Sequence, residues 1–266
     1  VNPSVLAGAA DLTENVDWRL QVNSPCINRG NNSSVLGSVD LAGSVRIQQD
    51  CVDMGCYESE YVRVVLPVYD SIIYVTQTGA GAKTGENWEN AMSSVEDAIA
   101  VATCYNAKVW VASGVYYGDT LLSNAITMRD GVSVYGGFAG NEPADYDLSQ
   151  RDFAANATIL DGQHSRRVVS QPNSFNTLTA LDGFTIQNGY TTGYGGGAYL
   201  QHNMSLSNCR FVNNESRGSG GGLYFNGSNN SDTIRGCSFE NNIARSSGGG
   251  GYINYASIDN CLIVNN

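Results

Sequence analysis

Leu206-Ser-Asn-Cys209-Arg-Phe211-Val-Asn213-Asn214 is one of four copies of a pattern that fills the last third of the chain. In each copy an apolar residue is followed by a second three positions later, a third two positions after that, and an asparagine two positions further on. The other copies begin at Leu181, Ile234 and Ile258, so successive copies start 25, 28 and 24 residues apart. Units of this length cannot enclose a core alone, and each must stack on its neighbours.

A second block, Gly195-Gly-Gly-Ala-Tyr199-Leu, also recurs, with further glycine triplets beginning at Gly220 and Gly248. Apolar and polar side chains alternate in both blocks, which is typical of strands with one buried face. Short strands that are separated by turns and stacked in parallel at about 4.8 Å form the coils of a solenoid. The sequence therefore predicts an all-β fold, a single-stranded parallel β-helix, with repeats over 178–266.

Equivalent positions of the repeats should stack into ladders along this solenoid. The inward ladders are Leu181/Leu206/Ile234/Ile258, Phe184/Cys209/Cys237/Cys261, Ile186/Phe211/Phe239/Ile263 and Ala198/Leu223/Gly251. The repeated asparagine is expected to stack its amide on the copies above and below. The residue after it (Gly189, Asn214, Asn242 or Asn266) is expected to adopt the left-handed conformation, which Gly and Asn tolerate.

Upstream of the repeats, apolar residues between Trp88 and Ala102 recur at spacings of 3, 1, 3, 3, 1 and 3. This pattern predicts one amphipathic helix over about 88–103 that caps the N-terminal end of the β-helix. Strands over 72–75, 108–112, 132–135 and 157–160 would form the first coils, and Gly136-Gly137 marks a tight corner.

Three segments are expected along the chain. Residues 1–58 form a turn-rich segment in which no helix is evident, 59–71 form a linker, and 72–266 form the β-helix. The last repeat ends without a cap at Asn266, so we expect further coils, a neighbouring module or another subunit to cover that end.

Composition limits the partners. The net charge of -11, with Lys83 and Lys108 as the only lysines, disfavours nucleic acid. No apolar run is long enough to span a membrane. The seven cysteines do not suit a disulfide-built fold, and the pairing of Cys26, Cys51 and Cys56 stays open. The three inward cysteines of the repeats are expected to pack as small apolar side chains rather than to bind metal.

Several motifs in order resemble a known group of proteins. They are Ile73-Tyr-Val75, Gly85-Glu-Asn-Trp88, Val109-Trp-Val-Ala-Ser-Gly-Val-Tyr116, the Gly131–Gly140 segment and Arg151-Asp152, followed by the GGGxY and FxNN copies. They resemble right-handed β-helix surface proteins of Bacteroidetes and are similar to the repeats of chlamydial polymorphic outer membrane proteins. Asp40-Leu-Ala-Gly43 and Val52-Asp-Met-Gly-Cys-Tyr-Glu58 resemble the closing segment of choice-of-anchor proteins, which implies that residues 1–58 close a preceding β-helix or anchor-type module. The resemblance also implies that the β-helix is right-handed and pectate-lyase-like. It further implies a cell-surface, outer-membrane-associated or extracellular location and an adhesin-like role.

The candidate binding residues are Tyr199, Tyr224 and Tyr252, which should point outward and stack in one row. Aromatic rows can bind sugar rings through their faces, although they also stabilise sheets by packing. His164, Arg166 and Arg167 form a basic turn that could bind an anion, but the favoured interpretation is ordinary surface.

Two weaker kinds of site are also present. Glu142, Asp145 and Asp147 share one loop and could hold Ca²⁺, the one cofactor considered, although a solvated turn is favoured because no calcium-loop spacing is present. Ser71, Thr120 and Thr233 follow aspartate and precede an apolar residue, a pattern that resembles the O-glycosylation sites of Bacteroidetes.

The predicted function is that of a non-enzymatic surface or secreted protein, a rigid stalk or a platform for a glycan or a cell-surface protein. The alternative on the same fold is a polysaccharide lyase or glycoside hydrolase, which needs clustered carboxylates. The repeats offer few acids, namely Asp182, Glu215, Asp232, Glu240 and Asp259.

Overall fold

A computed structural model describes residues 35, 37–47, 52–53, 57–58, 72–118, 122–228 and 232–266. The chain divides into two compact units, Val1–Val68 and Tyr69–Asn266. The predicted linker 59–71 lies outside the described residues, as do most of the predicted closing segment and Cys26, Cys51 and Cys56. The first unit contains an antiparallel bridge between Val39 and Val45.

The turn between these two valines is organised by one carboxylate. Asp40 accepts hydrogen bonds from the backbone N–H groups of Ala42 and Ser44, each at 2.8 Å. It also accepts one at 2.8 Å from the backbone N–H of Glu58. These bonds, that of Glu58 above all, hold the pKa of Asp40 below its usual value.

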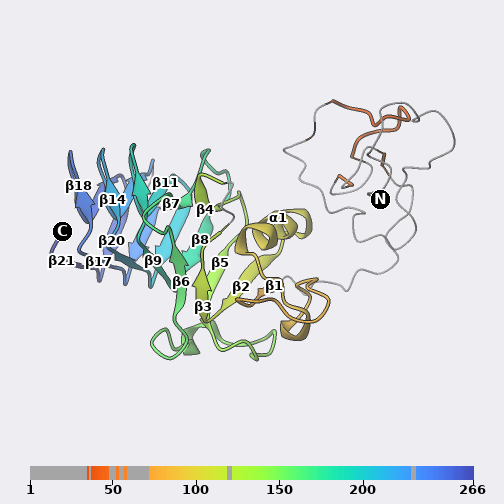
Figure 1. The fold of residues 1–266 in the computed structure, drawn as a ribbon, viewed down its shortest axis with the longest axis horizontal. Coiled ribbons are helices and arrows are strands. Elements are labelled where there is room, and N and C mark those ends of the chain that lie inside the picture. The colour runs from red at the N-terminus through yellow and green to blue at the C-terminus, as the bar shows by residue number, and fades with distance from the viewer. Residues whose placement is uncertain are drawn as a thin grey trace. The chain divides into compact units, whose positions relative to one another are not determined.

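The second unit is a parallel β-helix of about six turns, whose coils stack side by side in Figure 1. Sheet 1 has seven strands in the order β1 (Ile72–Val75), β2 (Lys108–Ala112), β5 (Val134–Phe138), β8 (Thr179–Asp182), β12 (Met204–Ser207), β16 (Thr233–Arg235) and β20 (Ser257–Asp259). Sheet 2 has six, in the order β3 (Gly114–Tyr116), β6 (Thr158–Asp161), β9 (Phe184–Gln187), β13 (Arg210–Val212), β17 (Ser238–Glu240) and β21 (Leu262–Val264).

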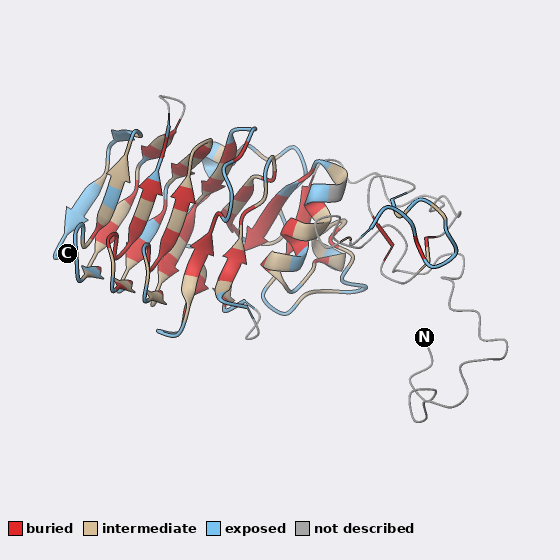
Figure 2. Cartoon of the chain, turned by 90° about the horizontal axis from the view of Figure 1, so that it is seen from above, coloured by how far each residue is buried: buried red, intermediate tan, exposed pale blue. Residues whose placement is uncertain are grey.

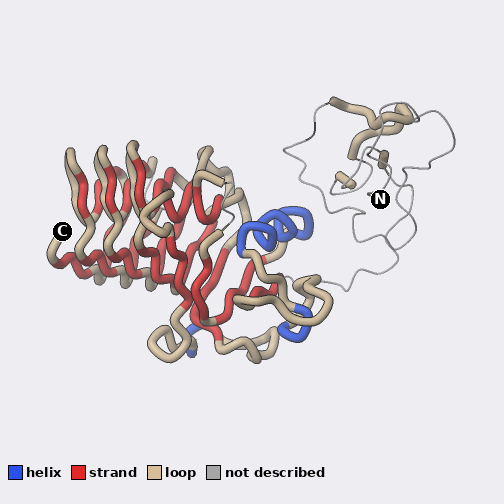
Figure 3. The backbone as a smooth tube through the Cα atoms, in the orientation of Figure 1, coloured by secondary structure: helices blue, strands red, loops and turns tan. Residues whose placement is uncertain are grey.

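Two further sheets complete the coils. Sheet 3 has five strands in the order β4 (Asn124–Thr127), β7 (Arg167–Ser170), β11 (Ala198–Gln201), β15 (Leu223–Asn226) and β19 (Gly251–Asn254). Sheet 4 has three short strands in the order β10 (Tyr190–Thr191), β14 (Glu215–Ser216) and β18 (Ile243–Ala244). In Figure 3 the strands and turns of successive coils follow the same path, one behind another.

The strand registers confirm the predicted inward ladders. Leu206 pairs with Leu181 and with Ile234, which in turn pairs with Ile258. Phe211 pairs with Phe239, and the two buried rings stack with centroids 4.9 Å apart. Ala198, Leu223 and Gly251 are likewise in register. The prediction of which side chains point into the solenoid and which point outward is therefore confirmed.

The asparagine ladder is present, but one residue later than predicted. The first asparagine of each pair is the left-handed one, with φ between 53° and 56° at Asn188, Asn213, Asn241 and Asn265. The second asparagine points inward and stacks its amide. Asn242 Nδ2 donates to the carbonyl of Phe211 at 3.0 Å, while its Oδ1 accepts from Nδ2 of Asn214 at 2.9 Å.

Gly189 does not have the positive φ that the sequence predicts. Glycine is needed there for a different reason. A Cβ on Gly189 would collide with the carbonyl of Gly196 and approach Oδ1 of Asn214. The backbone N–H of Gly189 instead donates to that Oδ1 at 2.8 Å, so the ladder begins at Asn214.

The predicted helix over 88–103 is two elements in the structure. A 3₁₀ turn, η3 (Trp88–Asn90), comes first, and helix α1 (Val95–Tyr105) begins only after Ser94, whose side chain accepts a hydrogen bond from the backbone N–H of Asp97. The intervening Met92 forms a parallel bridge with Val75 of β1, because its N–H donates to the carbonyl of Tyr74 and its C=O accepts from the N–H of Thr76, the residue after β1. Backbone pairing to an edge strand thus interrupts the helical pattern.

Helix α1 packs on the first coils, where it contacts β1, β2 and β4. Its buried side chains include Val95, Ala98, Ile99 and Ala102. Figure 1 places α1 beside β1 and β2. That α1 closes the end of the solenoid, and that the coils wind right-handedly, stay predictions.

Gly136 and Gly137 lie inside strand β5 rather than at the predicted corner. The register between β2 and β5 shifts at this point, and Gly137 has a φ of 89°, so the pair forms a bulge. The bulge accompanies an aromatic cluster on the outer face of sheet 1, in which Trp110 stacks on Phe138 with centroids 4.5 Å apart. A short 3₁₀ turn, η4 (Leu148–Gln150), follows in the loop beyond β5.

Burial of the inner faces depends on the next coil. Figure 2 shows buried positions continuing along the strands until the last coil, which is largely exposed. Ile258 and Ile263 are exposed, whereas Ile234 and Phe239 one coil earlier are buried. Each coil therefore relies on both neighbours for its hydrophobic contacts.

Candidate functional site

Three tyrosines form an outward-facing ladder on sheet 3, in which Tyr199 and Tyr224 are half-buried and Tyr252 is exposed. Tyr199, Tyr224 and Tyr252 are in register on β11, β15 and β19, and their inward neighbours Ala198 and Leu200 are buried. The ring centroids are 5.4 and 5.1 Å apart, and the rings deviate from parallel by only 3° and 5°. This tyrosine ladder is the outward row that the sequence predicts.

The glycine triplets before these strands allow the coils to approach closely. Gly195, which opens the first triplet, has a φ of 67°, a left-handed conformation that favours glycine. A Cβ on the next residue, Gly196, would collide with the carbonyls of Glu215 and Gly221 in the following coil. The triplets therefore fix the sharp corner from which the tyrosine strands start.

The faces of the tyrosine rings are largely covered. The Arg167 guanidinium lies over Tyr199, 5.4 Å from the ring centroid, at the N-terminal end of the row. Tyr194 stacks on Tyr224 with centroids 4.9 Å apart. Burial, followed by the neighbouring phenols, raises the pKa of Tyr224 above its usual value. A ligand would therefore meet ring edges and hydroxyl groups rather than open aromatic faces.

Arg167 is held in place by three hydrogen bonds. Its Nε donates to the carbonyl of Gly195 at 3.0 Å, its Nη2 to the carbonyl of Tyr194 at 2.8 Å, and its Nη1 to Oδ1 of Asn124 at 3.3 Å. Burial lowers the pKa of this guanidinium below its ordinary value. Arg167, on β7, thus contacts the next coil both at the corner that precedes β11 and at Tyr199, the first ring of the tyrosine ladder.

The sequence pointed to this arginine only as part of a basic turn. Nothing in the local sequence relates Arg167 to Tyr199 or to Tyr194. The signal is the register, since Ala198 pairs with Val169 and thereby brings β7 beside β11. An alignment of the four repeats does not include Arg167, because β7 lies before the first copy.

Each carboxylate of the repeats has a structural partner. Asp232 is buried and accepts hydrogen bonds from the backbone N–H groups of Met204 and Ser228. The others face arginines, in the pairs Asp182 with Arg151, Glu215 with Arg245, Glu240 with Arg210 and Asp259 with Arg235. These acids are spread over several faces and do not converge on a cleft.

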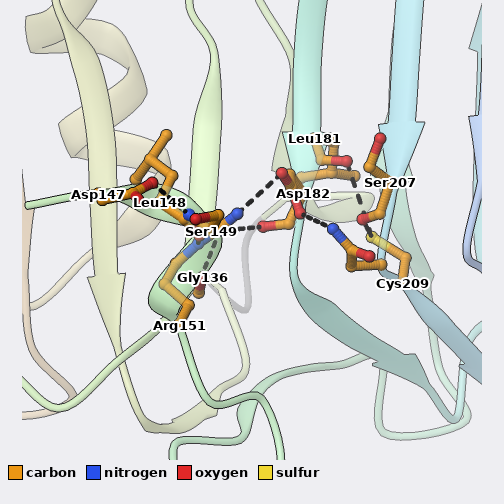
Figure 4. A network of polar contacts seen from close by, with 10 residues as sticks. Gly136, Asp147, Leu148, Ser149, Arg151, Leu181, Asp182, Ser207 and Cys209 are labelled. Atoms are coloured by element: carbon orange, nitrogen blue, oxygen red, sulfur yellow. Dashed lines mark hydrogen bonds and ion pairs between the residues drawn. The ribbon is translucent and has the colours of Figure 1, made fainter.

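The most buried of these ion pairs belongs to a network shown in Figure 4. Arg151 Nη2 lies 2.9 Å from Oδ2 of Asp182, and Arg151 also donates to the carbonyls of Gly136 and Leu148, each at 2.8 Å. Asp182 Oδ1 accepts from the amide of Asn208 at 2.9 Å. The network connects the loop after β5 to two coils, which is a structural role.

The acidic loop does not bring its three carboxylates together around one point. Glu142 accepts hydrogen bonds from the backbone N–H groups of three preceding residues, Ala139, Gly140 and Asn141. Asp147 accepts from the N–H of Ser149, a bond that lowers the pKa of the Asp147 carboxyl. Asp145 is exposed. Within the described ranges, no group of three or more His, Cys, Asp or Glu side chains is arranged to hold a metal ion.

The other candidate residue that the structure describes, Thr233, lies on sheet 1, apart from the tyrosine ladder on sheet 3. Thr233 is half-buried on β16, where its hydroxyl lies 3.0 Å from that of Ser205, and Ile234 beside it points inward as predicted. Ser71 and Thr120 lie outside the described residues. Cys209 and Cys237 are buried free thiols, and burial raises the pKa of Cys209.

Comparisons with known proteins identify no relative: no family model, curated protein or solved structure matches the chain. The likeness to Bacteroidetes surface proteins and to chlamydial repeats is supported only as far as the parallel β-helix itself. No helix in the described part of the chain is long and apolar enough to cross a membrane.

Proposed function

We infer that this protein is a non-enzymatic binding scaffold, in which a rigid β-helix presents the tyrosine ladder to a partner in an adhesin-like manner. The observation that carries the proposal is the in-register row of Tyr199, Tyr224 and Tyr252, whose rings are parallel to within a few degrees. Such a row on a hydrogen-bonded sheet is preorganised, which reduces the entropic cost of binding.

The chemistry of the row favours an extended glycan as the partner. Because the ring faces are covered except for the outer face of Tyr252, recognition uses a line of phenolic hydroxyls with the ring spacing of 5.1 to 5.4 Å. Asn226 and Asn254, two residues further along their strands, add an in-register pair of amides on the same face. Hydroxyl and amide groups at regular spacing suit a polymer with repeated hydrogen-bonding groups.

A polysaccharide lyase or hydrolase on the same fold is the competing function. Such enzymes need carboxylates that converge on the scissile bond or on a calcium ion. The five acids of the repeats instead have separate partners, among them Arg210 for Glu240 and Arg235 for Asp259. This distribution favours the scaffold.

A cell-surface or secreted location is part of the proposal. An abundance of neutral polar residues and glycine, with only 15% charged residues, is consistent with a turn-rich extracellular surface. O-glycosylation at Ser71, Thr120 and Thr233 belongs with that location. Peptide mass spectrometry of material from the native host should find modified hydroxyls, and three bare hydroxyls would remove this part of the proposal.

The decisive experiment removes only the hydroxyls of the row. In the triple variant Tyr199→Phe, Tyr224→Phe and Tyr252→Phe the rings can still stack, so the fold should be retained while glycan binding on an array is lost. Tyr255→Phe is the matched control, since Tyr255 is exposed but lies outside the row. Unchanged binding by the triple variant would contradict the proposal.

A depolymerisation assay separates the two function classes. The protein is incubated with acidic and neutral glycans, with and without Ca²⁺, and chain length is followed over time. The scaffold proposal expects no shortening. Turnover of any of these glycans would establish the enzymatic alternative.

A further inference from the structure

A hollow of about 430 Å³ opens where sheet 4 begins. Its wall comes from β10, from the turn that enters β7, and from the residues before and at the start of β4. The hollow exists because β10 has no strand before it: the preceding coil has a turn at 162–166 instead, and the carbonyl of Arg166 accepts a hydrogen bond from the N–H of Tyr190. The residues around it are Leu122, Ser123, Asn124, Ser165, Arg166, Arg167, Tyr190, Thr191 and Thr192.

The lining of this hollow is positively charged, whereas the whole chain has a net negative charge. Among the residues that the structure describes, the lining contains two guanidinium groups and no carboxylate, although the protein carries a net charge of -11. Most of the remaining lining residues carry hydroxyls, with the amide of Asn124 beside them. Guanidinium groups are suited to planar bidentate contacts with carboxylates and to contacts with other oxyanions.

Arg167 still has hydrogen-bonding capacity in this position. Its three hydrogen bonds use one N–H on each of Nε, Nη1 and Nη2. A guanidinium has five N–H donors, so two of those of Arg167 have no hydrogen-bond partner among the residues that the structure describes. The stacking on Tyr199 fixes the plane of the group. A preorganised, partly buried guanidinium binds an anion more strongly than a flexible surface arginine does.

We propose that this hollow binds the carboxylate or sulfate group of an acidic saccharide, with Arg166 and Arg167 as the anion-binding residues. The hydroxyls of Ser165, Thr191 and Thr192 would bond the sugar hydroxyls around the acid group. Because Arg167 also contacts Tyr199, the acid group would lie at the N-terminal end of the tyrosine ladder. The identity of the ligand as a saccharide rests on the proposed function, whereas the anion site does not.

Calorimetric titration of the full chain tests the site with three defined oligosaccharides. They are a chondroitin tetrasaccharide with carboxylates alone, its sulfated form, and neutral N-acetylchitotetraose. At least one of the two acidic probes should bind, and its affinity should fall as salt is added. Their comparison tells carboxylate from sulfate recognition. In Arg166→Gln the affinity for the acidic probe should fall by about tenfold or more, as expected for the loss of a charge-assisted hydrogen bond.

Arg235→Gln is the matched control, because it removes an exposed arginine from sheet 1 and should leave the affinity unchanged. Equal binding of neutral and acidic probes, or an Arg166→Gln variant with the wild-type affinity, would overturn the proposed anion site.

A titration with inorganic sulfate separates this inference from the proposed function. Chemical shifts of the arginine side-chain N–H groups should move with sulfate in the wild type and respond less in Arg166→Gln. If sulfate and the acidic probes produce this response while the triple tyrosine variant binds glycans normally, the anion site stands and the tyrosine ladder fails as a binding surface. Absence of any sulfate response in the wild type would overturn the anion site alone.

Discussion

At the level of single residues, the inward-facing side chains of the strands contribute far more to stability than the outward-facing ones. Phe239 is buried and stacks on Phe211. Tyr224, in contrast, lies on the outward face of sheet 3 and is only half-buried. We expect Phe239→Ala to lower the free energy of unfolding by about 3–5 kcal/mol through lost burial and cavity formation.

Tyr224→Ala should cost much less, because each exposed cross-strand contact contributes only about 0.2–1 kcal/mol. Urea denaturation of both variants is the measurement. Equal losses would mean that the assignment of inner and outer faces is wrong.

The asparagine pairs offer a test with the same substitution at adjacent positions. Asn241 is left-handed with a φ of 54°, so Asn241→Gly should change the free energy of unfolding by less than about 1 kcal/mol. Asn242 is buried, and Asn242→Gly leaves the carbonyl of Phe211 and the N–H of Asn214 without their partners.

Each buried group left without a hydrogen bond costs about 1–3 kcal/mol, so Asn242→Gly should be far more damaging than Asn241→Gly. Thermal unfolding of the two variants would measure this difference. The reverse order would favour the assignment made from the sequence, in which the first asparagine of each pair stacks.

The same asparagines show where sequence reasoning stops. Three of the four copies have asparagine at both positions, so residue type cannot say which one turns and which one stacks. The copy with Asn188 and Gly189 favoured a left-handed conformation at the second position, which is wrong. Glycine is required at 189 because a Cβ there would collide with the carbonyl of Gly196, and not because φ is positive. Contacts between coils, which the local sequence does not contain, decide the question.

At the level of elements, helix α1 carries a carboxylate in an unfavourable environment. Glu96 is half-buried, and its carboxylate accepts a hydrogen bond from the N–H of Thr127 at 2.6 Å. Burial raises the pKa of Glu96 above its ordinary value of 4.5, although that bond and the charge of Arg129 act in the opposite direction.

Because the folded state holds this proton more tightly than the unfolded state does, the contribution of Glu96 to stability falls as pH rises from 4.5 through the raised pKa. Glu96→Gln keeps an oxygen for Thr127 but has no charge. Its stability relative to the wild type should therefore be greater at pH 7 than at pH 4. Chemical denaturation at the two pH values measures this, with the exposed Glu89→Gln as a control that shows no such difference. A gain for Glu96→Gln that is independent of pH would contradict the assignment.

The helix predicted over 88–103 is correct only in its second part, and the start of α1 explains why. The apolar spacing from Val95 to Ala102 is helical in the structure, whereas the part from Trp88 to Met92 is a 3₁₀ turn followed by an extended residue. The spacing cannot reveal that Met92 pairs with β1. Ser94 with Asp97 three residues later is a capping signal that would have given the boundary.

At the level of the whole molecule, the repeats made the fold predictable and left the site incomplete. Regular spacing determined which residues stack, and therefore the ladders and the tyrosine row. The hollow beside the row contains Asn124, Arg166 and Tyr190, which come from three separate segments, two of them outside the repeats. Their proximity follows from the irregular earlier coils, for which the sequence offers no template.

The parallel stacking of coils has a mechanical consequence. Hydrogen bonds between neighbouring coils are directed along the solenoid axis, so a force applied to its two ends pulls on them in series. Each coil of the repeats contains 24 to 28 residues and relies on its neighbours for burial. Stretching single molecules with optical tweezers should therefore release the coils in steps of roughly 80–100 Å of contour length, set by a fully extended chain. A single rupture of the entire β-helix would show instead that the coils share one indivisible mechanical unit.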